Sequence, residues 1–331
     1  MVHSITRTGR FLASLTLVAV VGFSMVAQTA KADIILTAGA DKKIKAWDPK
    51  TGKELKSIAA HSREVTVLAI SPDGKLVASG GADKKVKIWK LENGELVKEI
   101  TAHRSAVTAL AFSQDGTLLV SGGADKKVKL WTLPDGKQDA TLEAYADKIV
   151  GVSVISFGDT MIIIAGSADG VIAISGKDGN SIFQINTEHK RRLTAMGSNV
   201  KEGCIYSGGT DGILKFWSQG ANGEFEGGKH TGAINAIHTL TDDTKVLTGG
   251  ADGKLLIWSA TDHKKLAEVD SKLKGGITAI TTTPDGKTIF TAGAKVVKIW
   301  DAAGKLIKTV TAHKGKITAI IYVADKKEDK K

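Results

Sequence analysis

One set of four side chains returns about every 42 residues along most of this chain. In one copy, Ser79, Asp83 and Trp89 follow His61 by 18, 22 and 28 positions. Three further copies keep these offsets: His103, Ser121, Asp125, Trp131; His189, Ser207, Asp211, Trp217; and His230, Thr248, Asp252, Trp258. A period of this length is typical of one supersecondary unit stacked many times. It argues against a catalytic role for any single histidine or aspartate, because a catalytic set is needed only once.

Each unit contains four short strands separated by turns. In the unit that follows His61, apolar or alternating runs occur at residues 65–70, 76–79, 86–89 and 96–100. Ser-Pro-Asp-Gly, Gly-Gly-Ala-Asp and Asn-Gly separate them, and such sequences favour tight turns and hairpins. The pattern predicts four-stranded antiparallel sheets. Stacked radially in a closed ring, such sheets bury one another and leave no free ends.

The position of the histidine gives the number of units. It is occupied seven times, by His61, His103, Tyr145, His189, His230, Leu273 and His313. The last unit is split, because its first strand is expected at residues 316–321 and its next two at residues 34–37 and 43–47. Those N-terminal strands carry the matching network residues Thr37, Asp41 and Trp47. We therefore predict that the N-terminal strands pair with the C-terminal strand and close the ring.

These motifs resemble those of the WD-repeat β-propellers. They include Ala60-His61, Ser-Gly-Gly-Ala-Asp at residues 79–83, Ile88-Trp89, and the pairs Trp47-Asp48 and Trp300-Asp301. Most units have Ala-His where the family often has Gly-His. The resemblance covers about residues 33–323. It implies an all-β, seven-bladed propeller with four-stranded antiparallel blades.

The resemblance also implies a structural role for the repeated polar residues. In the family, tryptophan, serine or threonine, histidine and aspartate form a network that ties the third strand to the loop entering the first. A Ser-His-Asp nucleophile triad is the alternative, and fivefold repetition disfavours it. Two units depart from the pattern: one has Tyr145, Ala165 and Ser175, and the unit of Leu273 loses the aspartate. We interpret both departures as drift, with partner binding as the alternative.

Residues 1–32 have the layout of a secretory signal peptide. Arg7 and Arg10 precede an apolar run at residues 11–27, and Ala30-Lys31-Ala32 provides small residues at the two positions that matter for cleavage. The alternative is a transmembrane anchor, for which the run is short. The sequence thus predicts export to the periplasm or the exterior, with no stable membrane anchor after cleavage. It predicts a propeller at residues 33–323 and a charged, solvated tail at 324–331.

The chain is basic, with a net charge of +11. In the family, the histidine-bearing loops and aspartate-bearing turns share one rim. That rim would here carry Lys42, Arg63, Lys84, Arg104, Lys126, Lys148, Arg191, Arg192, Lys274 and Lys316. A ring of cations concentrates anions, so an anionic ligand is one expected partner. The alternative is that these residues only solubilise the protein and protect its edges.

Other classes of ligand are less favoured. Aromatic residues make up only 5% of the chain, and no nucleic-acid-binding module occurs. The lone Cys204 allows neither an intramolecular disulfide nor a thiolate metal cluster. His238, on an expected innermost strand, has no second histidine beside it in the pattern. We therefore expect no nucleic acid, no metal and no cofactor.

The sequence favours a non-catalytic protein-interaction scaffold of the WD-repeat type, monomeric and exported, that binds other proteins through the rim and channel mouth. The alternative is an exported enzyme or enzyme subunit with a site in the central channel. Residues 47–53 and 168–174 resemble the repeat of quinoprotein propellers. They lack the tryptophan that follows Thr-Gly-Lys in that repeat, so this alternative ranks second.

Overall fold

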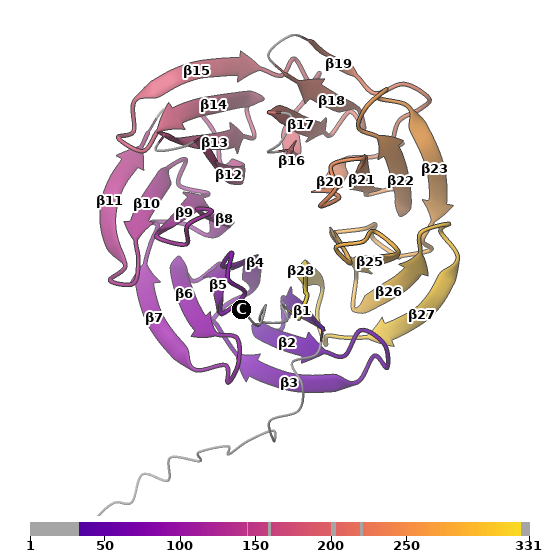
Figure 1. Cartoon of the computed structure of the whole chain (residues 1–331), viewed down its shortest axis with the longest axis horizontal. Coiled ribbons are helices and arrows are strands. Elements are labelled where there is room, and N and C mark those ends of the chain that lie inside the picture. Colours follow the sequence, from indigo (N-terminus) through magenta and orange to yellow (C-terminus); the bar gives the residue numbers. More distant parts are fainter. Residues whose placement is uncertain (1–32, 144, 158–159, 200–202, 219–220, 326–331) are drawn as a thin grey trace, which may run out of the picture. The chain divides into compact units, whose positions relative to one another are not determined.

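The computed structural model describes residues 33–325 except 144, 158–159, 200–202 and 219–220. These described residues form 28 strands in seven four-stranded sheets and contain no helix. The sheets are arranged as blades around a common central axis (Figure 1). The predicted all-β, seven-bladed propeller is confirmed. The predicted signal peptide, residues 1–32, lies outside the described residues.

The inner half of each blade consists of two strands. The strands that face the channel are β4 (Val65–Ile70), β8 (Val107–Phe112), β12 (Ile149–Phe157), β16 (Leu193–Asn199), β20 (Ile234–Thr239), β24 (Ala279–Thr282) and β28 (Ile317–Val323). The second strands are β5 (Leu76–Gly81), β9 (Leu118–Gly123), β13 (Thr160–Ser167), β17 (Cys204–Gly209), β21 (Lys245–Gly250), β25 (Thr288–Gly293) and β1 (Ile34–Gly39).

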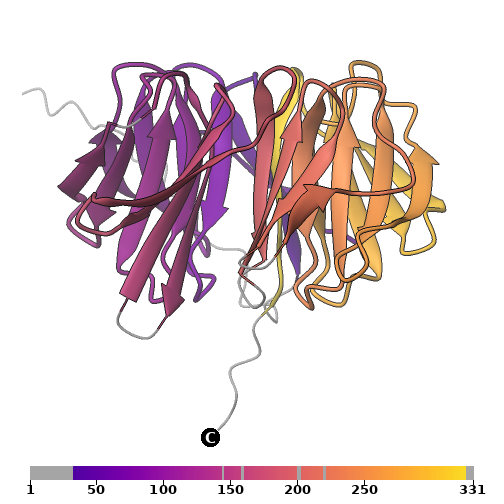
Figure 2. The same ribbon diagram turned by 90° about the horizontal axis from the view of Figure 1, so that it is seen from above.

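The outer half of each blade consists of two more strands. The third strands are β6 (Lys85–Lys90), β10 (Val128–Thr132), β14 (Val171–Gly176), β18 (Leu214–Trp217), β22 (Lys254–Ser259), β26 (Val296–Asp301) and β2 (Lys43–Trp47). The outermost strands are β7 (Leu96–Thr101), β11 (Lys137–Leu142), β15 (Ser181–Asn186), β19 (Asn222–Glu224), β23 (Lys265–Asp270), β27 (Leu306–Thr311) and β3 (Glu54–Ala59). Their turns and loops gather at the two faces of the ring (Figure 2).

Burial follows the radial position of the strand. All six residues of β9 are buried, whereas every residue of β3 except Ile58 is exposed. Second strands are covered on both faces by the neighbouring blades, which explains their continuous apolar runs. Gly80 of β5 shows how close the blades lie, because a Cβ atom there would be 2.6 Å from Val107 Cγ1 of the next blade.

The ring closes without a covalent bond between its ends. Strand β1 lies between β28 and β2, with Ile34 opposite Val323 and Thr37 opposite Ile320. The predicted pairing of the N-terminal and C-terminal strands is confirmed. Beyond β28, the Asp325 N–H donates to Asp33 Oδ1 at 3.0 Å. The start of the predicted tail is therefore bonded to the closing blade, and residues 326–331 lie outside the described residues.

Candidate functional site

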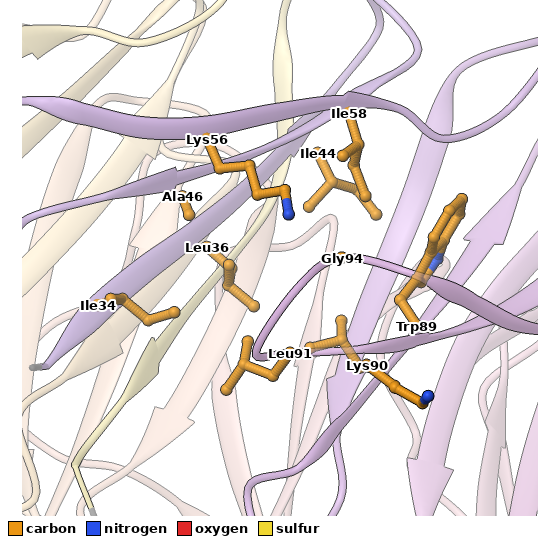
Figure 3. Close-up of a pocket in the computed structure, with 11 residues that line it drawn as sticks. Ile34, Leu36, Ile44, Ala46, Lys56, Ile58, Trp89, Lys90, Leu91 and Gly94 are labelled. Atoms are coloured by element: carbon orange, nitrogen blue, oxygen red, sulfur yellow. The ribbon is translucent and has the colours of Figure 1, made fainter. Parts of the chain in front are cut away.

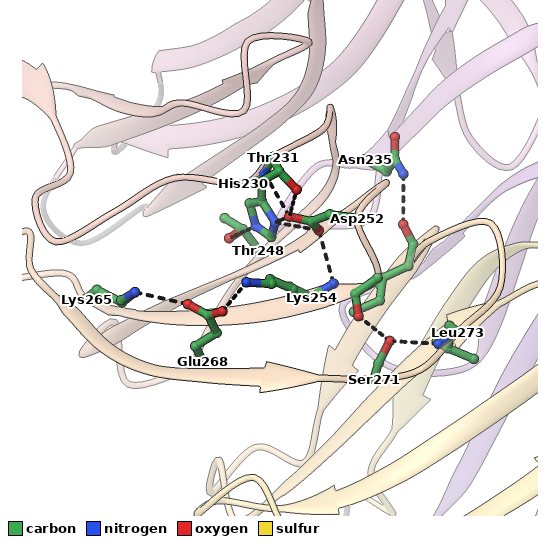
Figure 4. A network of polar contacts seen from close by, with 12 residues as sticks. His230, Thr231, Asn235, Thr248, Asp252, Lys254, Lys265, Glu268, Ser271 and Leu273 are labelled. Atoms are coloured by element: carbon green, nitrogen blue, oxygen red, sulfur yellow. Dashed lines mark hydrogen bonds and ion pairs between the residues drawn. The ribbon is translucent and has the colours of Figure 1, made fainter.

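The structure brings the four repeated side chains together as a polar network in each of five blades. In the β20–β23 blade, His230 Nδ1 lies 3.0 Å from Asp252 Oδ1 and His230 Nε2 lies 2.8 Å from Thr248 Oγ1 (Figure 4). Trp258 Nε1 donates to the same hydroxyl at 2.9 Å. The corresponding distances in the other four networks, those of His61, His103, His189 and His313, lie between 2.8 and 3.1 Å.

Burial, opposed in part by the network aspartate, determines the protonation state of each network histidine. Burial lowers the pKa of His103, and its bond to Asp125 only partly opposes this, so the imidazole is neutral at neutral pH. Burial alone would raise the pKa of Asp125, but hydrogen bonds from the Arg104 N–H and the His103 ring outweigh it and lower that pKa. The aspartate is thus ionised and accepts the histidine Nδ1–H. The hydroxyl then donates to Nε2.

The hydroxyl groups of the five networks are inaccessible to a substrate. The hydroxyl-bearing residues of the five networks are fully buried, at 0% exposure: Thr37, Ser79, Ser121, Ser207 and Thr248. A nucleophile must reach its substrate, so these hydroxyls do not act as one. The glycine before each turn is part of the seal, because a Cβ atom at Gly81 would lie 2.5 Å from His61 Nδ1.

Two blades lack a complete network. In the β12–β15 blade, Tyr145 is buried in the place of the histidine, and its hydroxyl has no hydrogen-bond partner among the described residues. Asp169 nevertheless accepts the Ala146 N–H at 3.1 Å, as the network aspartates do in their own blades. In the β24–β27 blade, Leu273 is buried, and Trp300 Nε1 still donates to Thr291 at 2.9 Å.

Replacement of His103 by alanine should lower the free energy of unfolding by about 2–4 kcal/mol, because it removes the imidazole that bonds both Ser121 and Asp125 and opens a cavity. Urea unfolding measures the change. Tyr145→Phe is the matched control: it removes a buried hydroxyl that bonds to none of the described residues, so stability should stay equal or rise. Equal losses in both variants would contradict the assigned network.

Sequence reasoning missed a second periodic set, which joins neighbouring blades. Thr66 Oγ1 donates to Val107 O of the next blade at 2.5 Å, and Thr318 Oγ1 donates to Val65 O at 2.5 Å. Thr194, Asn235 and Thr278 make the equivalent bonds. Each lies five residues after the histidine position, so the repeat itself contained the signal. We call these five contacts the inter-blade bonds.

All ten residues of the predicted basic rim are exposed. The histidine loops and aspartate turns meet through the His–Asp bonds, so Arg104, which follows His103, and Lys126, which follows Asp125, belong to one face. Among the ten, Arg192 forms an ion pair, with Asp147 at 2.7 Å. The other nine form none within the described part of the chain.

Three rim lysines have an unusual backbone. The φ angles of Lys42, Lys84 and Lys126 are 69°, 73° and 68°, a left-handed conformation that costs a non-glycine residue roughly 1–2 kcal/mol. Glycine occupies the same turn position in three other blades, at Gly170, Gly212 and Gly253. The three lysines lie in adjacent blades. They form an arc, which we call the strained lysine arc.

In two of the three turns, the lysine that follows the arc residue forms an ion pair. Lys85 pairs with Glu99 of β7, and Lys127 pairs with Glu143, which directly follows β11. Arc residues Lys84 and Lys126 have no such partner among the described residues. The arc therefore carries net positive charge toward solvent.

Metal-ligating side chains do not converge in the described residues, where no group of three or more His, Cys, Asp or Glu is placed to hold an ion. His238 on β20 is partly buried, and its Nε2 lies 3.1 Å from Thr282 Oγ1 of the next blade. Burial lowers its pKa to about 4. His238 thus serves as a neutral hydrogen-bonding residue between two channel strands.

One apolar cavity lies between the closing blade and the β4–β7 blade (Figure 3). Its volume is about 50 Å³, and its lining includes Leu36, Ile44 and Trp89. Lys56 lies at this cavity and donates to Asn93 O. Ligand sites usually have volumes of ~300–1,000 Å³, so this cavity admits only a few atoms and offers no room for a quinone-sized cofactor.

No helix in the described part of the chain has the length and apolar character needed to cross a bilayer.

The seven blades, the buried networks and the non-covalent closure define a WD-repeat β-propeller. A family model described as the first β-propeller of IFT122 matches residues 24–294, and the chain belongs to this family.

Individual relatives are distant. The chain is 24% identical over 180 residues to cilia- and flagella-associated protein 52 of Sus scrofa, covering 53% of this chain and 29% of that protein. It is 26% identical over 168 residues to pre-mRNA-processing factor 19 homolog 2 of Arabidopsis thaliana, covering 49% and 32%. The matched segments therefore span about a third of these relatives. A crystal structure of the computationally designed protein Ika8 shares the fold, with a TM-score of 0.66 and 27% identity over 88% of both chains.

Proposed function

We propose that this protein is a non-catalytic scaffold that binds acidic segments of partner proteins through its basic rim. The observation that carries the proposal is the strained lysine arc. A lysine in a left-handed turn is less stable than glycine, which other blades of the same chain use at that position. Strain of this kind persists where the residue serves another purpose.

The surroundings of the arc support an acidic partner. On the same face, each loop that bonds a network aspartate adds a second basic residue: Lys314 in the loop at Asp41, Arg63 in the loop at Asp83, and Arg104 in the loop at Asp125. The carboxylates of those aspartates are occupied by histidine rings and backbone N–H groups. Their side chains are turned away from solvent and form no ion pair with the arc lysines within the described residues, so a ligand at the rim meets the lysine side chains directly.

A triple variant tests the arc. Lys42→Gly, Lys84→Gly and Lys126→Gly together should weaken binding of a fluorescent oligoglutamate peptide roughly tenfold, since exposed charge pairs contribute ~0.2–1 kcal/mol each. The melting temperature should not fall, because glycine accepts the left-handed turn without strain. Fluorescence anisotropy and thermal unfolding measure the two effects.

The control removes the same number of charges from neighbouring sites. Lys43→Gln, Lys85→Gln and Lys127→Gln together should affect peptide binding clearly less, because Lys85 and Lys127 are neutralised by glutamates. Equal effects of the two triple variants would show that the arc contributes no more to binding than any other surface charge. An oligoglutamate affinity unchanged by the glycine variant would refute the proposal.

Export from the cytoplasm is part of the proposal and is supported by the sequence of residues 1–32. Expression of the full chain in a bacterium should yield a mature protein that starts at Asp33 in the exported fraction. Intact-mass measurement would show this directly. An uncleaved chain that stays in the cytoplasm would refute export while leaving the proposed role of the rim untouched.

A further inference from the structure

The outer strand of the β12–β15 blade differs from the other six outer strands in charge. Strand β15 has the sequence Ser-Ile-Phe-Gln-Ile-Asn and contains no ionisable residue. The other six outer strands each carry at least one charge: Glu54 on β3, Lys98 on β7, Asp139 on β11, Glu224 on β19, Glu268 on β23 and Lys308 on β27. Charged residues, lysine above all, are a common device that prevents exposed sheet edges from pairing.

Strand β15 also exposes two large apolar side chains. Ile182 is 62% exposed and Phe183 is 59% exposed. A register shift places Ile182 in a β-bulge directly before Phe183, which pairs with Ile174 of β14, so two exposed apolar side chains stand next to each other at this edge. Its backbone pairs with β14 on one side and with no strand of the described chain on the other.

The adjacent strand shows the same loss of charge. The third strands of the other six blades contain lysine, whereas β14 reads Val-Ile-Ala-Ile-Ser-Gly. Ala173 pairs with Gln184 at a position where the β4–β7 blade pairs Lys87 with Glu99. The lost network, the uncharged β14 and the uncharged β15 therefore occur in one blade. We infer that this blade is specialised at its outer edge.

We propose that β15 pairs with β15 of a second copy of this chain, as an antiparallel edge-to-edge dimer. A two-fold axis makes such a contact self-complementary, and an uncharged strand places no like charges opposite each other. The charged residues on either side of β15 are compatible with a second copy of this chain as the partner. Lys177 and Asp178 precede the strand and Glu188 and Lys190 follow it, so antiparallel pairing brings two electrically neutral ends together. This dimer replaces the monomer expected from the sequence.

The size of the contact sets its strength. A six-residue edge buries less than the ~1,000 Å² of a typical stable interface, so association should depend on concentration. The basic rims of two copies repel each other at low ionic strength, and salt screens that repulsion. The dimer fraction should therefore rise with salt, whereas a dimer held by ion pairs would dissociate.

Sedimentation velocity over a range of protein concentrations tests the proposal. Phe183→Lys should lower the association constant roughly tenfold or more, because it places two lysines at the paired edge. Ile307→Lys is the matched control: Ile307 is 60% exposed on β27, next to Lys308, and its replacement should leave association unchanged. Melting curves of both variants verify that the fold is retained.

A second measurement locates the contact. Gln184→Cys should form a covalent dimer under mild oxidation, whereas Thr309→Cys on β27 should not; the native Cys204 is buried and does not compete. A protein that stays monomeric at all concentrations and salt levels would overturn the proposal. So would a dimer that tolerates Phe183→Lys or cross-links equally from Thr309→Cys.

Discussion

A chain that ends after Ala312 should fail to form the propeller. The truncation removes β28 and with it three buried side chains, Ile317, Ile320 and Val323. Loss of each large aliphatic side chain from a core costs about 2–5 kcal/mol. Their sum reaches the 5–15 kcal/mol that typically separates a folded domain from its unfolded state. The truncation also removes His313 and leaves β1 without its inner neighbour.

Far-ultraviolet circular dichroism and urea unfolding would show the loss of the cooperative transition. The control chain ends after Asp325 and retains β28 together with the Asp325–Asp33 bond, so it should unfold like the full chain. Because the closure is non-covalent, a synthetic peptide of residues 312–325 should restore part of the transition in a concentration-dependent manner. A truncated chain as stable as the control would show that β28 does not hold the ring.

Acidification should destabilise the protein well before its aspartates are protonated. Burial lowers the pKa values of the five network histidines below the ordinary 6.5, and it lowers that of His238 to about 4. Below pH 6.5 the unfolded chain takes up protons that the folded chain does not. The stabilisation is therefore present above pH 6.5 and is lost progressively as the pH falls toward the folded-state pKa values.

Urea unfolding at pH values between 7 and 4 measures the effect. Each histidine that remains neutral in the folded state contributes a slope of up to ~1.4 kcal/mol per pH unit. His238→Gln retains a hydrogen-bonding side chain toward Thr282 but cannot titrate. The free energy of unfolding of this variant should therefore fall less steeply with pH, by up to ~1.4 kcal/mol per pH unit. A free energy of unfolding that does not change between pH 7 and 5 would contradict neutral buried histidines.

The fold was largely predictable because the sequence repeats it. Seven occurrences of the histidine position gave the blade number, and the placement of Thr37, Asp41 and Trp47 at the N-terminus gave the closure, as the structure confirms. The five networks assembled from residues that the periodic offsets had already grouped. Repetition supplies several independent copies of the same weak signal.

The remaining features depend on geometry that residue type does not show. Nothing in the Asp-Lys-Lys motif distinguishes Lys84 from Lys85, yet only Lys84 has a left-handed backbone and only Lys85 pairs with a glutamate. Asp169 keeps the aspartate position four residues after Ala165, but its bond to the Ala146 N–H could be seen only in the structure. The uncharged edge of β15 became apparent only when all seven outer strands were aligned in space.

The distribution of the inter-blade bonds determines where the ring should open locally. Among the described residues they occur at five of the seven seams, and the two seams without one border β12, because Thr108 Oγ1 bonds Gly122 O of its own blade and Val150 has no hydroxyl. The seam between β12 and β16 is bridged instead by the hydroxyls of Ser153 and Ser198, 2.8 Å apart, and by the Arg192–Asp147 ion pair. Amide hydrogens along β12 and β13 should therefore exchange with solvent through small openings, whereas those of β4 and β5 require larger ones. The closed ring should therefore open most readily at the seam between β8 and β12, which borders the blade with the uncharged edge.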